Sequence, residues 1–197
     1  MEKKYKLTDE TIKIGEKILY RIEALENFSN VKKGDKGGFI EHERNLSQYC
    51  NCWIYGNAKV YDNAHVFDDA EVFDCAKIFG NAEVYDNAKI YGNAVVCDNA
   101  VVCVNAKIYD NVKVCDNAEV YGDAIITRNS DYIVFKNWWS SGRYFTWTRS
   151  NNMWYVGCFY GTGEELIEKA YKDSKLSGDE YKRIVDYVNS INNCPGN

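Results

Sequence analysis

The stretch AKVYDNAHVFDDAEVFDCAKIF, residues 58–79, returns to nearly the same letters every six positions. Each module has a small residue, a variable residue, Val or Ile, an aromatic residue and two turn-forming residues. Thirteen such hexads follow one another without an insertion from Trp53 to Ser130. The third position of the module is apolar and branched in every copy: Ile54, Val60, Val66, Val72, Ile78, Val84, Ile90, Val96, Val102, Ile108, Val114, Val120 and Ile126.

A strict period of six excludes an amphipathic helix, whose apolar residues recur at three and four, and it fits a short strand followed by a corner. Because neighbours on a strand point to opposite sides, Ala64 and Val66 point inward and His65 points outward. The Asp-Asn and Gly-Asn pairs tolerate the left-handed backbone of a turn. Three hexads then make one coil of a triangular prism, and thirteen make about four coils. Such a prism is filled by Val, Ile and Ala and has no interior ligand cavity.

The hexads resemble those of the left-handed parallel β-helix, or hexapeptide-repeat, family over residues 53–130, about 40% of the chain. The left-handed sense of the coil is implied by this resemblance alone. The preceding stretch, VKKGDKGGFIEHERNLSQYCNCWIYGNA, is similar to the entry segment of uncharacterised hexapeptide-repeat proteins from bacterial genomes, phages and prophages. The resemblance therefore implies a phage or prophage origin.

The segments on either side of the repeat differ from it in composition. Residues 1–45 alternate apolar and polar residues, with Gly15 at the turn of an expected hairpin, and are predicted to cap the 46–130 β-helix. The sequence KKGDKGGF, residues 32–39, lacks the spacing of a phosphate-binding loop and is predicted to be a turn. Residues 131–197 are rich in aromatic residues and are predicted to form a small α+β domain. Its two helices are expected to begin at the capping boxes Thr162–Glu165 and Ser177–Glu180. The predicted fold class is thus mainly β.

Residues eighteen apart stack in register, so the outward residues form three faces. The Trp53 face carries Trp53/Tyr55, Glu71/Phe73, Lys89/Tyr91, Lys107/Tyr109 and Ile125/Thr127. The Lys59 face carries Lys59/Tyr61, Lys77/Phe79, Val95/Cys97 and Lys113/Cys115, and the His65 face carries His65/Phe67, Glu83/Tyr85, Val101/Cys103 and Glu119/Tyr121. Stacked aromatic rings and pairs such as Glu71 with Lys89 stabilise a solenoid.

Four outward apolar residues interrupt this pattern at one corner: Val95, Cys97, Val101 and Cys103. A contiguous apolar patch is typical of a contact surface. The family resemblance implies side-by-side association, so a homo-oligomer, a trimer or dimer, is the first expected partner. At the corners, Asp98 and Asp116 stand at adjacent levels, where a cation could relieve their repulsion. A metal site is nonetheless not predicted.

The carboxy-terminal segment supplies the second candidate site. Arg143, Trp147 and Arg149 alternate onto one face of an expected strand, and Trp138, Trp139 and Trp154 lie near them in sequence. Arginine between aromatic rings can stack a base or clamp a phosphate, which favours a nucleotide or single-stranded nucleic-acid site within residues 136–160. The alternative is a small domain whose tryptophans form its core.

Catalysis is not predicted. The acyl-CoA-dependent acyltransferases of the family use a base, usually His, and this chain has only His42 and His65. The catalytic loop that leaves the coils in those enzymes has no counterpart in thirteen contiguous hexads. The family's zinc-dependent carbonic anhydrases need three histidines. We therefore expect no cofactor and no catalytic residue, with His65 as the base only in the acyltransferase alternative.

Composition limits the remaining choices. A net charge of −5 gives no general attraction to DNA, and the apolar runs are too short to span a membrane. Eight cysteines without an export signal indicate free thiols and a cytoplasmic location. With the implied phage origin, the sequence favours a non-catalytic, host-directed binding protein. An inhibitor of bacterial immunity, anti-CRISPR or other anti-defence, that binds a host protein or a nucleotide is the expected type.

Overall fold

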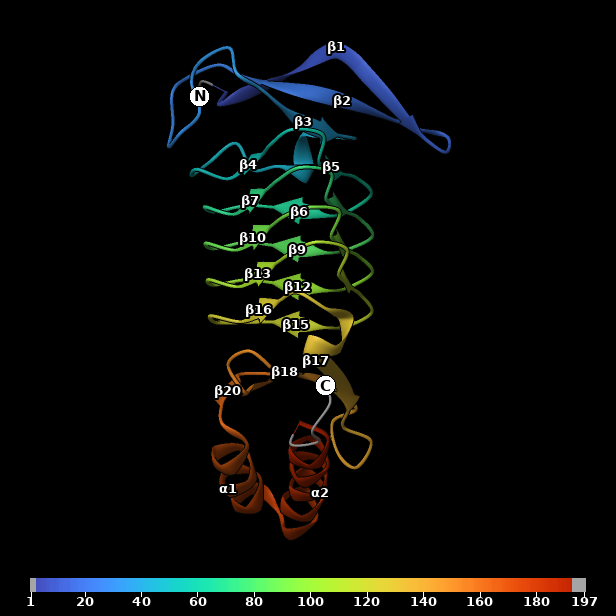
Figure 1. Cartoon of the computed structure of the whole chain (residues 1–197), viewed down its shortest axis with the longest axis vertical. Helices are drawn as coiled ribbons and strands as arrows, with labels where there is room; N and C mark the ends of the chain where they lie inside the picture. The colour runs from blue at the N-terminus through green and yellow to red at the C-terminus, as the bar shows by residue number, and fades with distance from the viewer. Residues whose placement is uncertain (1–2, 193–197) are drawn as a thin grey trace. The chain divides into compact units, whose positions relative to one another are not determined.

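A parallel β-solenoid forms the centre of the chain (Figure 1). The computed structural model describes residues 3–192, and it contains one two-residue strand for each of the thirteen hexads. These strands are β4 (Trp53–Ile54), β5 (Lys59–Val60), β6 (His65–Val66), β7 (Glu71–Val72), β8 (Lys77–Ile78), β9 (Glu83–Val84), β10 (Lys89–Ile90), β11 (Val95–Val96), β12 (Val101–Val102), β13 (Lys107–Ile108), β14 (Lys113–Val114), β15 (Glu119–Val120) and β16 (Ile125–Ile126).

The strands pair in parallel at a spacing of eighteen residues, as the period predicts. Lys89 lies opposite Glu71 on one side and opposite Lys107 on the other, with Ile90 opposite Val72 and Ile108. The second residue of every strand points inward and is 0% exposed, and so is the preceding Ala in nearly every coil. The interior is therefore a dry stack of Val, Ile and Ala, which confirms the predicted filling of the prism.

The solenoid begins one coil earlier than the hexads indicate. Strand β3 (Lys36–Ile40) pairs in parallel with β5, with Phe39 opposite Lys59, and an isolated bridge joins Leu46 to Val66. Both spacings are twenty residues, so the repeat count misses this coil. The sheet order β3-β5-β8-β11-β14 gives five levels instead of about four. The prediction of a turn over residues 32–39 is wrong in its second half, because Lys36–Phe39 belongs to β3.

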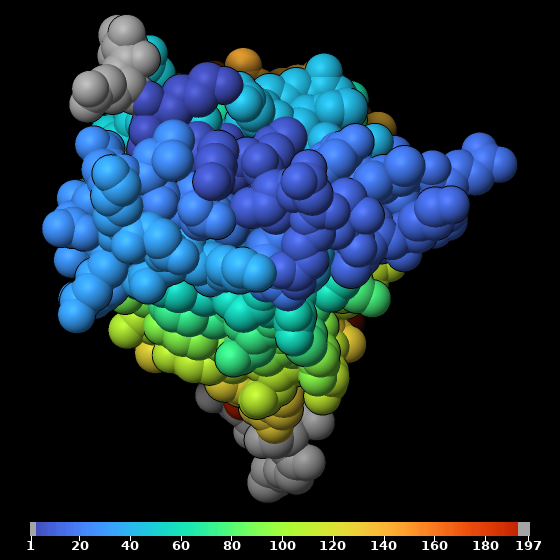
Figure 2. Space-filling view, turned by 90° about the horizontal axis from the view of Figure 1, so that it is seen from above, coloured from blue at the N-terminus to red at the C-terminus, as the bar shows by residue number. Residues whose placement is uncertain are grey.

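The amino-terminal hairpin is confirmed. Strands β1 (Tyr5–Ile14) and β2 (Lys17–Ala24) are antiparallel and turn at Gly15, whose φ is +59°. Strand β2 pairs with β3, so the hairpin continues a solenoid sheet. Seen from above, the hairpin covers the end of the coils and projects beyond one side of them (Figure 2). Its apolar residue Leu19 packs with Tyr61, and Phe79 lies against the same cluster.

Lys4 fastens the amino terminus to the first coil through a buried ammonium group. The side chain is 2% exposed, and Nζ donates to the carbonyl oxygens of Tyr49 at 3.2 Å, Cys50 at 3.2 Å and Cys52 at 3.0 Å. The Cys52 Sγ is 3.4 Å from Nζ. Burial raises the pKa of the Cys52 thiol above its usual value. Neutral carbonyl oxygens, rather than a carboxylate, therefore hold this cation.

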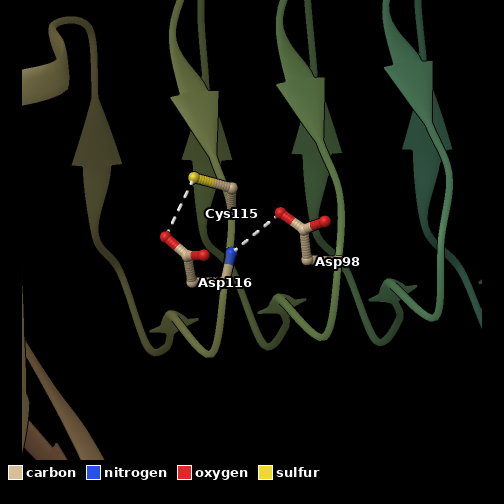
Figure 3. Close-up of side chains that lie close together, drawn as sticks. All are labelled: Asp98, Cys115 and Asp116. Atoms are coloured by element: carbon tan, nitrogen blue, oxygen red, sulfur yellow. Dashed lines mark hydrogen bonds between the residues drawn. The ribbon is translucent and has the colours of Figure 1, made fainter.

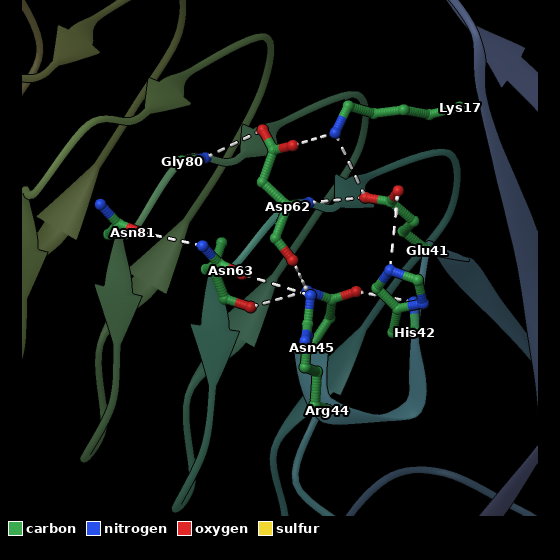
Figure 4. A network of polar contacts seen from close by, with 10 residues as sticks. Lys17, Glu41, His42, Arg44, Asn45, Asp62, Asn63, Gly80 and Asn81 are labelled. Carbon is green, nitrogen blue, oxygen red and sulfur yellow. Dashed lines mark hydrogen bonds and ion pairs between the residues drawn. The ribbon is translucent and has the colours of Figure 1, made fainter.

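A polar network ties the hairpin to the first corner (Figure 4). Lys17 from β2 forms an ion pair with Asp62, and the Asp62 backbone N–H donates to Glu41 Oε2 at 2.8 Å. Asn45, the last residue of the 3-10 helix Glu43–Asn45, is fully buried and donates from Nδ2 to the Ala64 carbonyl at 2.8 Å. The network satisfies backbone groups that the end of a solenoid would leave unpaired.

The twelve corners from Gly56 to Gly122 each have a residue in the left-handed backbone region at the fifth position of the hexad. Asp or Gly stands at eleven of them, and the twelfth is Val104, with a φ of +65°. Asn residues follow these corners, and Asn63 donates to Asn81, Asn81 to Asn99 and Asn99 to Asn117 at 3.0–3.4 Å. The predicted Asn column is thus hydrogen-bonded along the corner. Valine, which is β-branched, is strained at this φ.

We expect Val104→Asn to stabilise the solenoid by about 1 kcal/mol, because Asn tolerates the left-handed region that costs Val about 1–2 kcal/mol. The backbone bonds of this corner, Asn87 N–H to the Val104 carbonyl and Val104 N–H to Asp86 Oδ2, do not involve the side chain. Urea unfolding followed by circular dichroism measures the change. Val104→Ile keeps the strain and serves as the control, and equal stability of the Asn and Ile variants would contradict the strain.

The carboxy-terminal unit begins at Ser130, and the amino-terminal unit with cap and solenoid ends at Asn129. After the 3-10 helix Asn129–Asp131, the strands β17 (Tyr132–Lys136), β18 (Tyr144–Thr148), β19 (Met153–Val156) and β20 (Phe159–Gly161) form an antiparallel sheet in chain order. The helices α1 (Gly163–Asp173) and α2 (Lys175–Asn192) follow. Thr162 caps α1 with the predicted capping box to Glu165.

The predicted start of the second helix is wrong. Helix α2 begins at Lys175, and the Ser177 backbone N–H donates to Ser174 Oγ at 3.0 Å, so Ser174 acts where Ser177 was expected. The core between sheet and helices contains eight buried residues: Phe145, Trp147, Trp154, Leu166, Ala170, Tyr181, Val185 and Val188. Within residues 3–192, no helix is long and apolar enough to cross a membrane.

Candidate functional site: a cationic pocket in the carboxy-terminal unit

A pocket of about 380 Å³ opens between the β17–β18 loop, the β19–β20 turn and the two helices. Its lining combines apolar side chains with polar and charged ones, the charged ones from the β17–β18 loop and α1. The lining residues are Asn137, Ser140, Ser141, Arg143, Val156, Cys158, Phe159, Leu166, Lys169, Ala170, Asp173, Ser177 and Tyr181. An apolar cavity with a few convergent polar groups is the usual form of a small-molecule site.

Asn137 shapes one wall of the pocket. It is 4% exposed, its backbone N–H donates to the Arg143 carbonyl at 2.7 Å, and its Oδ1 accepts the Ser140 backbone N–H at 2.9 Å. Its Nδ2 donates to the Tyr181 hydroxyl at 3.1 Å. Because this bond occupies the phenol oxygen as an acceptor, the Tyr181 O–H is oriented as a donor. Burial raises the pKa of Tyr181, so the hydroxyl keeps its proton at neutral pH.

Two cations line the pocket from opposite segments. Arg143 ends the β17–β18 loop, and its guanidinium lies so close to Gly157 that an added Cβ there would be 3.0 Å from Nη1. Lys169 of α1 places Nζ 5.3 Å from the centre of the Phe159 ring. Asp173 is the one carboxylate in the lining, so the fixed charge of the pocket is +1 (two cations less one anion). The site therefore favours a small anion that also carries an apolar part.

The structure divides the six residues of the predicted aromatic and arginine site. Arg143 lines the pocket, whereas Trp147 is 0% exposed and Trp154 is 2% exposed within the core. Their expected role as ligand-stacking rings is corrected, because no ring face is open to a ligand. The alternation of apolar residues on β18 could not separate a buried face from a binding face, since both sides of this strand are covered.

The other three residues also lie outside the pocket lining. Trp139 is partly buried against Tyr181, and Trp138 is 72% exposed. The Arg149 guanidinium lies 5.9 Å from the centre of the Trp147 ring. Arg149 does not line the pocket with Arg143. Sequence reasoning missed Asn137, Lys169 and Tyr181. The available signal was the position of Lys169 beside the inward Leu166 and Ala170 of an amphipathic helix.

The predicted apolar patch at the solenoid corner is only half present. Cys97 and Cys103 are each 2% exposed, whereas Val95 and Val101 are partly exposed. Burial raises the pKa of Cys97 to about 12 and of Cys103 to about 11, so both stay protonated. The seven cysteines within the described part of the chain are free thiols, as predicted, and Cys194 lies outside it.

One corner of the solenoid gathers possible metal ligands from Asp98, Cys115 and Asp116, whose ligand atoms lie within 4.8 Å of one another (Figure 3). Their atoms are engaged with each other. Asp98 Oδ2 accepts the Asp116 backbone N–H at 3.2 Å, and the Cys115 thiol is 3.5 Å from Asp116 Oδ2. The backbone bond holds the pKa of Asp98 below its usual value. This geometry is explained by corner hydrogen bonding.

His65, the base of the acyltransferase alternative, stands on the outer face of β6. Its ring centre is 4.7 Å from that of Phe67, and burial lowers its pKa. His65 does not line the carboxy-terminal pocket or the pocket beside the amino-terminal hairpin. The histidine therefore packs at the end of an aromatic column.

The comparisons with known proteins give no family. Neither a protein-family model nor a curated protein matches this chain. The parallel solenoid and the pocket thus carry the functional conclusion.

Proposed function

We propose that this chain is a non-catalytic binding protein whose carboxy-terminal pocket takes a small anion with a flat apolar part, in the first instance a nucleotide. One observation carries the proposal: Arg143 and Lys169 line the same cavity of about 380 Å³, whose lining also contains apolar side chains. A phosphate can accept from the guanidinium and ammonium groups, and the Tyr181 hydroxyl offers a further donor. A base can pack against the apolar part of the lining, which includes Phe159.

The proposed origin of the protein, and therefore the cell that supplies its ligand, rests on the sequence resemblance. We propose that the solenoid is a left-handed coil of the hexapeptide-repeat type, and that the protein is phage- or prophage-encoded and acts in the host cytoplasm. Under this proposal the pocket sequesters a host nucleotide, such as a signalling nucleotide of bacterial immunity. In the other form of the anti-defence proposal, the protein binds a host protein instead of a nucleotide.

Calorimetric titration with mononucleotides, cyclic nucleotides and inorganic phosphate tests the pocket. We expect one nucleotide class to bind, and Arg143→Gln and Lys169→Gln each to weaken binding about 10- to 100-fold, the effect of losing a hydrogen bond to a charged group of about 1.5–3 kcal/mol. Lys172→Gln is the matched control, because Lys172 is exposed on α1 and does not line the pocket. Unchanged affinity in the Arg143 variant, or no binding by any member of the panel, would refute the proposal.

Acyl transfer is the competing class, and turnover separates the two. Coenzyme A esters contain a nucleotide, so their binding alone does not discriminate. The binding-protein proposal predicts no acetyl transfer from acetyl-CoA to hydroxyl or amine acceptors. Product formation that disappears in His65→Ala would instead establish the acyltransferase.

A further inference from the structure

The carboxylate of Asp173 does not suit a ligand that consists of a phosphate group alone. Asp173 lines the carboxy-terminal pocket together with the cations Arg143 and Lys169. In the part of the chain that the structure describes, its exposed carboxylate has no ion-pair or hydrogen-bond partner. A carboxylate accepts hydrogen bonds and repels a phosphate, so it favours a ligand that also brings hydrogen-bond donors into the pocket.

Asp173 lies close to both cations of the pocket. It follows Lys169 by four residues on α1, and side chains at this spacing lie on the same side of a helix, with Cβ atoms about 5–6 Å apart. Burial is the main cause of the raised pKa of Tyr181, but the charge of Asp173 also raises this pKa, and that of Arg143 lowers it. Both charges therefore act at the Tyr181 hydroxyl, which lines the same cavity of about 380 Å³.

The two cations converge on the turn between β19 and β20. The Arg143 guanidinium lies beside Gly157 of this turn. Lys169 Nζ lies 5.3 Å from the centre of the ring of Phe159, where the turn ends. A phosphate bound there can accept from both cations. Because the ribose of a nucleotide is bonded to the phosphate and the base is at the far end, the ribose is the part nearest to Asp173, one helical turn from Lys169.

We propose that Asp173 accepts the two hydroxyl groups of the ribose cis-diol, so that the pocket selects ribonucleotides in which both hydroxyls are free. The inference rests on the proposed function, because it starts from a nucleotide phosphate held by Arg143 and Lys169. The two carboxylate oxygens match the two neighbouring donors of a cis-diol, and hydrogen bonds to a charged acceptor are stronger than those between neutral groups. A nucleotide without these hydroxyls leaves the carboxylate unpaired beside its phosphate, and such a site discriminates strongly.

Calorimetric titration of the full chain with matched ligands tests this role of Asp173. The probes are the 5′-monophosphates of adenosine, guanosine, cytidine and uridine, each compared with its 2′,3′-dideoxy form. For the base that binds best, we expect the ribonucleotide to bind about 10- to 100-fold more tightly than the dideoxy form, the effect of losing hydrogen bonds to a charged group. Equal affinity of the two forms would overturn the inference.

Asp173→Ala shows whether this carboxylate causes the difference. We expect the variant to reduce the difference between the two forms to less than about 3-fold, and to bind the dideoxy form more tightly than the parent chain does, because the repulsion of its phosphate is removed. Glu168→Ala is the matched control and is expected to keep the full difference, because Glu168 is an exposed acidic residue of the same helix outside the pocket lining. If Asp173→Ala kept the ribose difference and lost a preference for guanine, the carboxylate would contact the base and the inference would be wrong.

The result also separates this inference from the proposed function. If no nucleotide binds, including the cyclic nucleotides, the proposed function and the role of Asp173 are both refuted. If nucleotides bind without a difference between the ribose and dideoxyribose forms, or if only nucleotides without a free cis-diol bind, the role of Asp173 alone is refuted.

Discussion

Lys4→Met is expected to lower the free energy of unfolding of the amino-terminal unit by about 3–5 kcal/mol. The substitution keeps the length of the side chain but removes the ammonium group that donates to the carbonyl oxygens of Tyr49, Cys50 and Cys52. Methionine offers no donor, so the Cys52 carbonyl loses its partner in a buried position, and the partly buried bonds to the Tyr49 and Cys50 carbonyls are lost as well. Urea unfolding followed by far-ultraviolet circular dichroism measures the loss.

The neighbouring residue supplies the control. Lys3 forms an ion pair with Glu43 at 2.6 Å, but its side chain is 54% exposed, so Lys3→Met is expected to cost less than about 1 kcal/mol. If the two variants lost similar amounts of unfolding free energy, the hydrogen bonds from Lys4 to the three carbonyl oxygens would contribute little to stability.

Trp147→Ala is expected to destabilise the carboxy-terminal unit by about 3–5 kcal/mol, the usual cost of truncating a large buried aromatic residue. The Trp147 ring is fully buried among the core residues of the sheet and helices, and Nε1 donates to Asn152 Oδ1 at 3.0 Å. Proteolysis of the folded chain should then cleave first after Ser130. The solenoid should keep its circular dichroism, because its core is separate.

Trp138→Ala distinguishes a core role from a surface role for these tryptophans. Trp138 is 72% exposed, so its truncation is expected to change stability by less than about 0.5 kcal/mol. If Trp147→Ala instead left stability unchanged and weakened nucleotide binding, the assignment of Trp147 to the core would be wrong.

The solenoid could be predicted from the sequence because each six-residue repeat corresponds to one strand and one corner of the coil. One branched apolar residue every six positions defines the strand, the inward face and the eighteen-residue register at once. The first coil escaped because its strand β3 pairs at a spacing of twenty. Gly37 and Gly38 mark it physically, since a Cβ on Gly38 would be 2.5 Å from the Ala58 carbonyl oxygen. In the sequence, a pair of glycines suggests a turn. Here the glycines are needed because the strands pack too closely to leave room for a side chain.

The candidate site was less predictable because it joins residues that are distant in sequence. Asn137 reaches Tyr181 across forty-four positions, and Lys169 comes from a helix outside the segment chosen for its tryptophans. The many aromatic residues of the segment 136–160 suggested a binding site, but Trp147 and Trp154 belong to the hydrophobic core. Of the six predicted residues, Arg143 lines the pocket, because a loop end leaves its side chain free of the packed sheet.

The eighteen-residue register also governs how the length of this protein can change during evolution. A deletion of three hexads removes one coil and returns every later residue to its own face, so the Lys and Glu columns stay aligned. A deletion of one hexad keeps the inward valines inward but turns every later residue onto the neighbouring face. Descendants of this chain should therefore differ by multiples of eighteen residues wherever the charge of a face is under selection, and by multiples of six where only the core is.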